Sequence, residues 1–251
     1  MWGAVNDRMQ YVAGIDIACF QTDVNMRLRP AAFMDLAQEM AYQAAETMGF
    51  GYGALLNEGK AWVLSRMHFK FLKAPHWGDR VSMATWHKGP SGPFFIREFS
   101  MDSPQGEPLV RATSSWIAID SVNRRMARPA EVELLVPSST VCPIHSIEEH
   151  APKVLMPRGV NLEPIGEHKV NYTDVDLLGH TNNARYMVWA MDCIPYTTLS
   201  TGKVSDVQIN FNHETTAGQS VAISRCERDG VYFVEGNVEG RNAFTARIEF
   251  R

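Results

Sequence analysis

Residues 30–49 read PAAFMDLAQEMAYQAAETMG, a stretch that begins with proline and ends with glycine. Its apolar residues recur at spacings of three and four, the period of a helix with one buried face; they are Phe33, Leu36, Ala37, Met40, Ala41, Ala44, Ala45 and Met48. Proline suits the first turn of a helix and glycine suits its end. The stretch therefore predicts a long amphipathic helix that needs a large apolar partner surface.

Alternating sequences downstream supply that surface. Two runs place apolar residues at every second position, namely Met67, Phe69, Phe71 and Val207, Ile209, Phe211. A period of two with one apolar face is typical of half-buried antiparallel strands, and turn signals separate further strands, including 112–120 and 243–250. Such a sheet needs a cover, so we predict an α+β fold in which a long helix lies on an antiparallel sheet.

The same unit occurs twice. Thr22-Asp23-Val24-Asn25 is echoed by Thr173-Asp174-Val175-Asp176 at an offset of 151, and Phe71, Gly78 and Val81 recur as Phe211, Gly218 and Val221 at an offset of 140. A second helix is expected over residues 182–193. Six of the 13 prolines fall between residues 129 and 164, which is typical of a linker. We predict two units, 1–128 and 167–251, joined by a proline-rich linker over 129–166.

The composition excludes several classes of protein. The chain has 251 residues, 45% hydrophobic, with a formal net charge of −4, which argues against a nucleic-acid partner. No stretch approaches the roughly 18 apolar residues needed to cross a bilayer, so a soluble, cytoplasmic protein without membrane contact is expected. The four cysteines are scattered, so neither a metal site nor a disulfide framework is expected.

The densest polar run is residues 172–186, which read YTDVDLLGHTNNARY. Two carboxylates, a histidine and two carboxamides lie within ten residues, where a helix is expected to begin. Gly179 allows the backbone to turn, and the first turn of the helix presents N–H groups suited to a developing negative charge. Helix capping alone explains Asn182 and Asn183, but the whole run, with Asp176 and His180 four apart, favours a catalytic site.

This run, D-x-D-x-x-G-H-x-N-N-x-x-Y, resembles the signature of hotdog-fold thioesterases. In the first half, residues 61–66 (AWVLSR), 85–86 (TW) and 112–116 (ATSSW) resemble the N-terminal half of the acyl–acyl carrier protein (acyl-ACP) thioesterases of plants and bacteria. The resemblance extends from about Tyr11 to the C-terminus and includes the duplication. It implies two tandem hotdog units, each a long helix wrapped by an antiparallel sheet.

The resemblance also implies site residues. The aspartate and histidine of the family's D-x-N-x-H motif fall on Asp176 and His180, whereas its asparagine falls on Leu178, which is a departure. The family's downstream glutamate falls on Glu214. At the offsets above, the first copy has Asn25, Arg29 and Ala74 in place of Asp176, His180 and Glu214. The resemblance implies the same division of roles: the first unit shapes the acyl pocket and the second carries the chemistry.

The implied reaction is hydrolysis of a fatty acyl-ACP thioester, which releases a free fatty acid and terminates fatty acid synthesis. Glu214 or Asp176 is expected to act as general base, with His180 polarising the water or protonating the thiolate; alternatively, Asp176 attacks directly to give an anhydride. Helix N–H groups, Asn182 or Asn183 would hold the oxyanion. The implied partner is acyl carrier protein with a phosphopantetheine-linked acyl chain, no cofactor is implied, and a monomer (a pseudo-dimer) or a homodimer fits the duplication.

Two alternatives remain open from the sequence. A hotdog hydrolase of acyl-CoA or another small thioester has the same motif, and a basic patch near the pocket mouth would favour the acidic carrier protein instead. A non-catalytic acyl-binding hotdog is favoured by Leu178 and disfavoured by the joint presence of Asp176, His180 and Glu214. A hotdog dehydratase or hydratase fits the motif less well.

Overall fold

The computed structural model describes residues 3–251, so the first two residues of the predicted unit 1–128 lie outside the described residues. The first unit contains β1 (Ala4–Val5), β2 (Tyr11–Asp16), α1 (Pro30–Thr47), α2 (Tyr52–Asn57), β3 (Lys60–Phe71), β4 (Arg80–Ser91), β5 (Phe94–Asp102) and β6 (Pro108–Asp120). After the short helix α3 (Pro129–Glu133), the second unit contains β7 (Glu163–Lys169), α4 (Asn183–Asp192), α5 (Tyr196–Thr201), β8 (Val204–Phe211), β9 (Ser220–Arg228), β10 (Val231–Val238) and β11 (Arg241–Phe250).

All eleven strands form one antiparallel sheet, in the order β1-β2-β4-β5-β6-β3-β8-β11-β10-β9-β7. Apart from β1, the order is symmetric about the pair β3–β8, where the two units join edge to edge. Pairing at this junction leaves neither unit with an exposed edge in the middle of the sheet. The predicted α+β class is confirmed.

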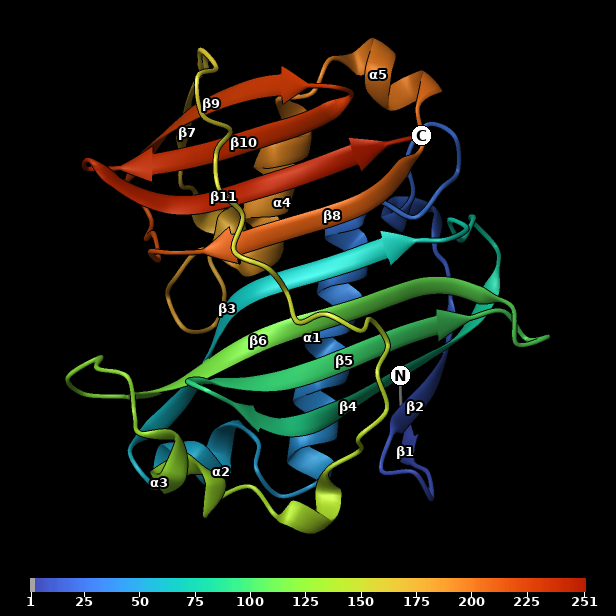
Figure 1. The fold of residues 1–251 in the computed structure, drawn as a ribbon, viewed down its shortest axis with the longest axis vertical. Coiled ribbons are helices and arrows are strands. Elements are labelled where there is room, and N and C mark those ends of the chain that lie inside the picture. Colours follow the sequence, from blue (N-terminus) through green and yellow to red (C-terminus); the bar gives the residue numbers. More distant parts are fainter. Residues whose placement is uncertain (1–2) are drawn as a thin grey trace.

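Helices α1 and α4 lie on the same face of the sheet, α1 behind the first unit and α4 behind the second (Figure 1). Pro30 opens α1 at its first position, as predicted, and nine of the eleven buried residues of this helix belong to the main core, which includes residues of the strands. Phe33 of α1 contacts Phe69 of β3, with ring centroids 5.0 Å apart. Helix α4 is shorter than α1 and buries Tyr186, Met187 and Trp189. Of the helices in residues 3–251, none has the length and apolar character needed to cross a membrane.

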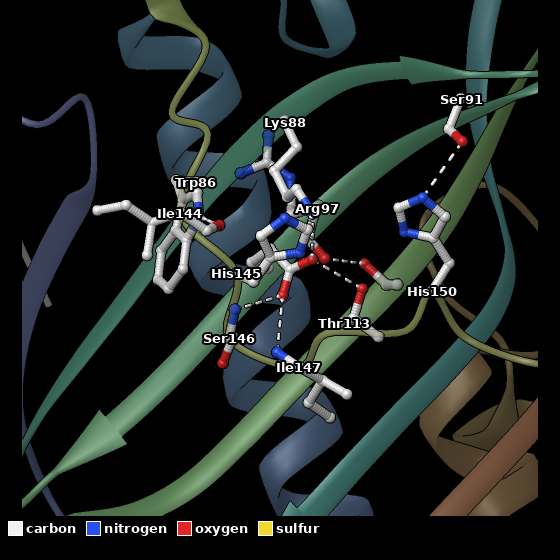
Figure 2. A network of polar contacts seen from close by, with 12 residues as sticks. Trp86, Lys88, Ser91, Arg97, Thr113, Ile144, His145, Ser146, Ile147 and His150 are labelled. Atoms are coloured by element: carbon white, nitrogen blue, oxygen red, sulfur yellow. Dashed lines mark hydrogen bonds and ion pairs between the residues drawn. The ribbon is translucent and has the colours of Figure 1, made fainter.

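The segment between the units crosses the opposite face of the sheet (Figure 1). Glu98 on β5 is fully buried there and accepts hydrogen bonds from the backbone N–H groups of Ser146 (2.9 Å) and Ile147 (3.3 Å) and from the Thr113 hydroxyl (3.1 Å) (Figure 2). Lys88 lies 3.6 Å from the same carboxylate. A buried carboxylate needs this number of donors. The connection is therefore fastened to the sheet.

Candidate active site

The backbone between Asp174 and Asn182 forms a tight loop that ends where α4 begins. Asp176 N–H donates to the carbonyl of His180 (2.9 Å), and Gly179 N–H donates to the carbonyl of Asp176 (3.0 Å). Gly179 has a φ of +80°, a conformation in which residues with a Cβ are strained, so the glycine predicted to permit a turn is at the required position. We call residues 174–182 the Asp176 loop.

Asp176 supports this loop with its side chain. Its Oδ1 accepts a hydrogen bond from the backbone N–H of Leu178 at 2.9 Å, an arrangement in which an aspartate mimics a backbone turn. The Leu178 side chain is 50% exposed. Leu178 thus takes part in the loop through its backbone N–H, which any residue except proline provides.

His180 and Glu214 lie together in the structure. His180 Nδ1 lies 3.1 Å from Glu214 Oε2, and the second carboxylate oxygen of Glu214 pairs with Arg124. Arg124 belongs to the turn after β6, so the first unit contributes a cation to a site otherwise built by the second. Both members of the His180–Glu214 pair are partly exposed, at 30% and 42%. Sequence reasoning missed Arg124, because 90 residues separate it from Glu214.

A buried hydroxyl cluster holds Glu214 beside the Asp176 loop. Thr215 Oγ1 lies 2.6 Å from Thr181 Oγ1 and 2.9 Å from the Tyr186 hydroxyl, which also accepts the Thr215 N–H at 3.0 Å. Thr181 N–H donates to the Thr215 carbonyl at 2.8 Å. Burial raises the pKa of Tyr186 above its ordinary value, although its hydrogen bonds to Thr215 oppose the shift. The tyrosine therefore stays protonated and keeps its donor.

Sequence reasoning also missed this cluster as a positioning device. Tyr186 closes the quoted motif, three residues after Asn183, and Thr215 directly follows Glu214, so both lie close in sequence to candidate residues. A tyrosine on the apolar face of a helix is usually read as core. The signal that distinguishes it is the hydroxyl partner, and that partner lies 29 residues away.

The two asparagines have different roles. Asn182 is the N-cap of α4: its Oδ1 accepts the Ala184 N–H at 2.9 Å, and its Nδ2 lies 3.4 Å from Gln38 Oε1. Asn183 lines a small cavity, of about 10 Å³, with residues of α1 and of the first unit's sheet, namely Met34, Ala37, Gln38, Leu64, Met67, Phe99, Ser114 and Trp116. Of the two predicted oxyanion donors, Asn183 is therefore the one that faces an interior space. We call this space the first cavity.

Asp174, the first carboxylate of the motif, is buried and structural. Its Oδ2 accepts the Asn171 N–H at 2.8 Å and lies 3.0 Å from His168 Nε2. Burial alone would raise the pKa of Asp174, but these hydrogen bonds and the charge of His168 hold it below its ordinary value. The carboxylate therefore remains ionised and ties the loop to β7.

The first unit has a loop of the same form, residues 21–29, which we call the Asp23 loop. Asp23 N–H donates to the Arg27 carbonyl, Met26 N–H donates to the Asp23 carbonyl, and Asp23 Oδ1 accepts the Asn25 N–H, at 2.8–2.9 Å. The Asp176 loop forms the same three hydrogen bonds. In them Asp176, His180, Gly179 and Leu178 take the places of Asp23, Arg27, Met26 and Asn25. Met26 has the left-handed φ of Gly179, at +61°.

This equivalence corrects the internal alignment predicted from the sequence. The offset between the loops is 153 residues and not 151, because the hydrogen bonds match Asp23 to Asp176 and the helices start at Pro30 and Asn183. The counterparts of Asp176, Leu178 and His180 are therefore Asp23, Asn25 and Arg27; pairing Asp176 with Asn25 and His180 with Arg29 was wrong. Ala74 remains the counterpart of Glu214, since Pro75 and Thr215 accept equivalent backbone bonds from Leu28 and Thr181.

Comparison with known proteins identifies related chains. Residues 8–134 match the family model described as the acyl-ACP thioesterase N-terminal domain, and residues 161–251 match that of the acyl-ACP thioesterase C-terminal domain. Oleoyl-acyl carrier protein thioesterase 2 of Arabidopsis thaliana is 24% identical over 230 residues, covering 84% of this chain and 61% of the relative. Dodecanoyl-[acyl-carrier-protein] hydrolase of Cinnamomum camphora is 26% identical over 198 residues, covering 74% and 51%. The chain thus spans about three fifths or less of the length of these relatives.

Solved structures share the whole fold. The 12:0-ACP thioesterase from Umbellularia californica superposes with a TM-score of 0.87 at 20% identity, over 97% of each chain. An acyl-ACP thioesterase from Bacteroides thetaiotaomicron gives a TM-score of 0.81 at 20% identity, over 98% of this chain and 99% of that one. The predicted arrangement of two tandem hotdog units is confirmed.

Proposed function

This chain belongs to the acyl-ACP thioesterase family, and we propose that it hydrolyses the thioester of fatty acyl-acyl carrier protein, releasing free fatty acid and ending fatty acid synthesis. The observation that carries the proposal is the pair His180–Glu214, held at 3.1 Å beside the N-terminus of α4. An imidazole fixed by a carboxylate, next to backbone N–H groups, is the arrangement that activates water and stabilises an oxyanion.

The hydrogen bonds favour His180 as the general base. An ionised carboxylate only accepts hydrogen bonds, so Glu214 requires the proton of His180 to be on Nδ1, which leaves a lone pair on Nε2. Both oxygens of Glu214 already have partners, in His180 and Arg124, and Oδ1 of Asp176 accepts the Leu178 N–H. Glu214 then orients the ring, Arg124 and the Thr215 cluster position Glu214, and Asp176 shapes the loop.

The reaction follows in two steps. Nε2 of His180 takes a proton from water while the water oxygen attacks the thioester carbonyl carbon, and the carbonyl oxygen becomes an oxyanion. We assign its stabilisation to the side-chain amide and backbone N–H of Asn183, because Asn182 caps the helix and accepts the N–H groups of Ala184 and Arg185. When the intermediate collapses, the C–S bond breaks and His180 returns its proton to the thiolate, leaving a fatty acid and a thiol.

The first unit is proposed to hold the acyl chain. The first cavity connects Asn183 with the space between α1 and strands β3, β5 and β6. At about 10 Å³ it holds roughly one water molecule, so an acyl chain enters only if side chains such as Met34 and Met67 change rotamer. Methionine does this readily because its side chain is unbranched and flexible.

An arginine-rich turn supports the carrier protein as partner. Arg124 and Arg125 follow the turn after β6 and Arg128 directly precedes α3; all three are exposed, Arg124 contacts Glu214, and Arg128 lies 3.3 Å from Glu131. The contact between Arg124 and Glu214 brings this basic segment close to the candidate site, which supports the carrier protein as partner. Acyl carrier protein is acidic, so charge attraction at this turn would orient it toward the pocket.

Thiol release from acyl chains presented on acyl carrier protein, coenzyme A and uncharged pantetheine tests the proposal. We expect the fastest release from the carrier protein, with an optimum in chain length. In Arg125→Glu, KM for acyl-ACP should rise about tenfold while acyl-pantetheine is hydrolysed as before; Arg8→Glu, at an exposed arginine in the β1–β2 turn, serves as the matched control. Faster release from coenzyme A would make this an acyl-CoA hydrolase, and no release from any carrier would favour a non-catalytic acyl-binding protein.

Asp176→Asn separates the two routes left open by the sequence. Asparagine keeps the Oδ1 acceptor for Leu178 N–H, so the loop is preserved. If Asp176 only shapes the loop, kcat should fall by no more than about tenfold. A fall of about 10²-fold or more, with the fold intact by circular dichroism, would instead make Asp176 the base or the nucleophile, since general-base groups contribute about 10²–10⁴-fold.

A further inference from the structure

A second cavity, of about 500 Å³, lies beside the Asp23 loop. It is a cleft lined by that loop, the start of α1, the C-terminal half of α4, helix α5 and the start of β8. Its volume is within the range of small-molecule sites, about 300–1,000 Å³. It is far larger than the first cavity, at about 10 Å³.

The second cavity occupies the position that corresponds to the active site under the internal symmetry. It is lined by Asp23, Arg27 and Ala74, the counterparts of Asp176, His180 and Glu214. Pro30 and Val204 line it where Asn183 and Leu64 line the first cavity. The duplication has therefore kept the position of the site on this side, and Arg27 and Ala74 stand in place of its imidazole and its glutamate.

In the first unit a cation, Arg27, stands in place of His180, and no carboxylate stands at the position of Glu214. Ala74 ends at Cβ, whereas Glu214 extends a carboxylate to His180. Arg27, in the place of His180, is 12% exposed and is held by Asp23 Oδ2 (3.2 Å) and the Gly202 carbonyl (2.8 Å), with a weak 3.5 Å contact to the Leu199 carbonyl.

The charges and walls of the cavity suit an amphipathic anion. The lining carries Arg27, Arg29 and Lys203 against Asp23 and Asp192, an excess of one positive charge. Asp23 is already paired with Arg27. The remaining walls are largely apolar and include Leu28, Ala31, Phe71, Val188, Met191 and Val204. Apolar walls below a cationic rim bind an alkyl chain with a charged head group.

We propose that the second cavity binds a linear alkyl chain with a terminal anionic group, such as a medium- or long-chain carboxylate. The head group takes the space that Ala74 leaves beside Arg27, with Lys203 and Arg29 at the rim, and the chain lies between α1 and α4 along Phe71 and Met191. This site is distinct from the active site and does not depend on hydrolysis, so it stands or falls separately from the proposed function.

Methyl NMR of protein labelled at the methionine Cε tests this directly, because methionines line both cavities. Met191 reports on the second cavity, and Met34 and Met67 report on the first; Met191→Leu assigns its signal. Titration with dodecanoate should shift the Met191 signal. Affinity should rise about fourfold for each added CH₂ until the chain fills the cavity. Dodecanol should bind at least tenfold more weakly, and dodecyl phosphate distinguishes the two head-group chemistries.

Ala74→Glu is the decisive variant. The introduced carboxylate occupies the space assigned to the ligand head group, so dodecanoate should lose at least tenfold in affinity at Met191. Ala74→Gln adds the same volume without charge and should lose less. Asp192→Asn removes an opposing charge from the lining and should tighten binding, whereas Lys203→Ala should weaken it several-fold.

Several outcomes would overturn the proposal. They are an unmoved Met191 signal, equal affinity for dodecanoate and dodecanol, or equal losses in Ala74→Glu and Ala74→Gln with both variants folded by circular dichroism. Acyl-ACP hydrolysis measured on the same variants is independent of this result. Absence of dodecanoate binding at Met191 in the parent protein, with acyl-ACP hydrolysis retained, would reject only the present inference.

Discussion

At Met26 and at Gly179 the chain makes the same left-handed turn, with φ values of +61° and +80°. Around each turn the same backbone hydrogen bonds form, and in each loop the leading aspartate accepts the N–H two residues on. The side chains that follow differ: Arg27 stands where the other loop has His180, and Ala74 where the other unit has Glu214. The two loops thus share an aspartate and a left-handed residue, whereas the positions proposed to carry the chemistry differ between them.

The largest effect is expected from a variant that removes the carboxylate of Glu214, which the first unit lacks. Glu214→Gln keeps the size of the side chain but loses the charge that fixes the His180 proton on Nδ1, so kcat should fall about 10²–10⁴-fold. Steady-state kinetics on acyl-ACP measure this. Leu177→Ala, in the same loop at a residue 89% exposed, should stay within twofold of the parent. A Glu214→Gln variant with parental kcat would contradict the proposed role of Glu214.

The next largest effect is a loss of stability at acid pH, caused by His87 in the first unit. His87 is buried against Phe50, and burial together with the charge of Arg97 lowers the pKa of His87 to about 4. The unfolded chain therefore binds this proton first, so the free energy of unfolding is unaffected above about pH 6.5 and falls between pH 6.5 and 4, by up to about 3 kcal/mol. In the second unit the counterpart of His87 is the exposed Glu227, at the offset of 140.

Urea unfolding as a function of pH, in the parent and in His87→Asn, measures this contribution. The variant should lose the decline between pH 6.5 and 4. Asp174 and Asp206, whose pKa values are held below the ordinary aspartate value, add their own destabilisation only at lower pH, as the pH falls through those values. An unchanged slope in His87→Asn would show that another group binds the proton.

A smaller effect is expected when the hydroxyl cluster of Thr181, Tyr186 and Thr215 beside the Asp176 loop is disturbed. Tyr186→Phe removes the acceptor of Thr215 N–H and leaves a buried donor unpaired, which should lower the free energy of unfolding by about 1–3 kcal/mol. Because Glu214 precedes Thr215, kcat should fall as well. Tyr232→Phe removes a hydroxyl contact to Thr198 elsewhere in the same unit and should leave kcat unchanged. Equal kinetics in the two variants would reduce Tyr186 to a purely structural role.

The smallest effect compares the two turns themselves. Gly179→Ala places a Cβ in the left-handed region and should cost about 1 kcal/mol in stability and lower kcat, because the loop shifts. Met26→Gly relieves the same strain in the Asp23 loop but makes the unfolded chain more flexible, so stability should change by less than about 1 kcal/mol. Thermal unfolding of both variants checks the difference. A larger loss for Met26→Gly would mean that the Met26 side chain contributes to packing.

Local patterns predicted much of the fold. The helix expected over 30–48 is α1, Pro30–Thr47, because proline and glycine mark its ends, and the helix expected over 182–193 is α4, Asn183–Asp192. The strands are found where the alternation indicated them. The join between β3 and β8 was not predicted, because backbone pairing between two edges has no residue signature.

The roles of the candidate site residues stay a prediction, and the sequence anticipated their geometry only in part. His180 and Glu214 are in contact, but matching the letters TDVN and TDVD aligned the two loops two residues out of register. The correct register depends on the hydrogen bonds that the Asp23 and Asp176 side chains accept, and matching residue types in the sequence does not show them. Arg124, the Thr215 cluster and the second cavity arise from contacts between distant segments, and no local pattern predicts them.

The seam between β3 and β8 has a consequence for how such a chain diverges after gene duplication. His68 of β3 faces Gln208 of β8, and with an offset of 140 these two are counterparts of each other. In an assembly of two identical chains, the residue at this position would face its own copy, so a protonated histidine would repel itself. Here a single histidine lies 2.9 Å from Asp206, and Arg247 binds the other oxygen of that carboxylate. In a fused chain, the two residues that face each other at the β3–β8 junction can differ, so one of them can be charged. A mutation in one unit then leaves the equivalent position of the other unit unchanged.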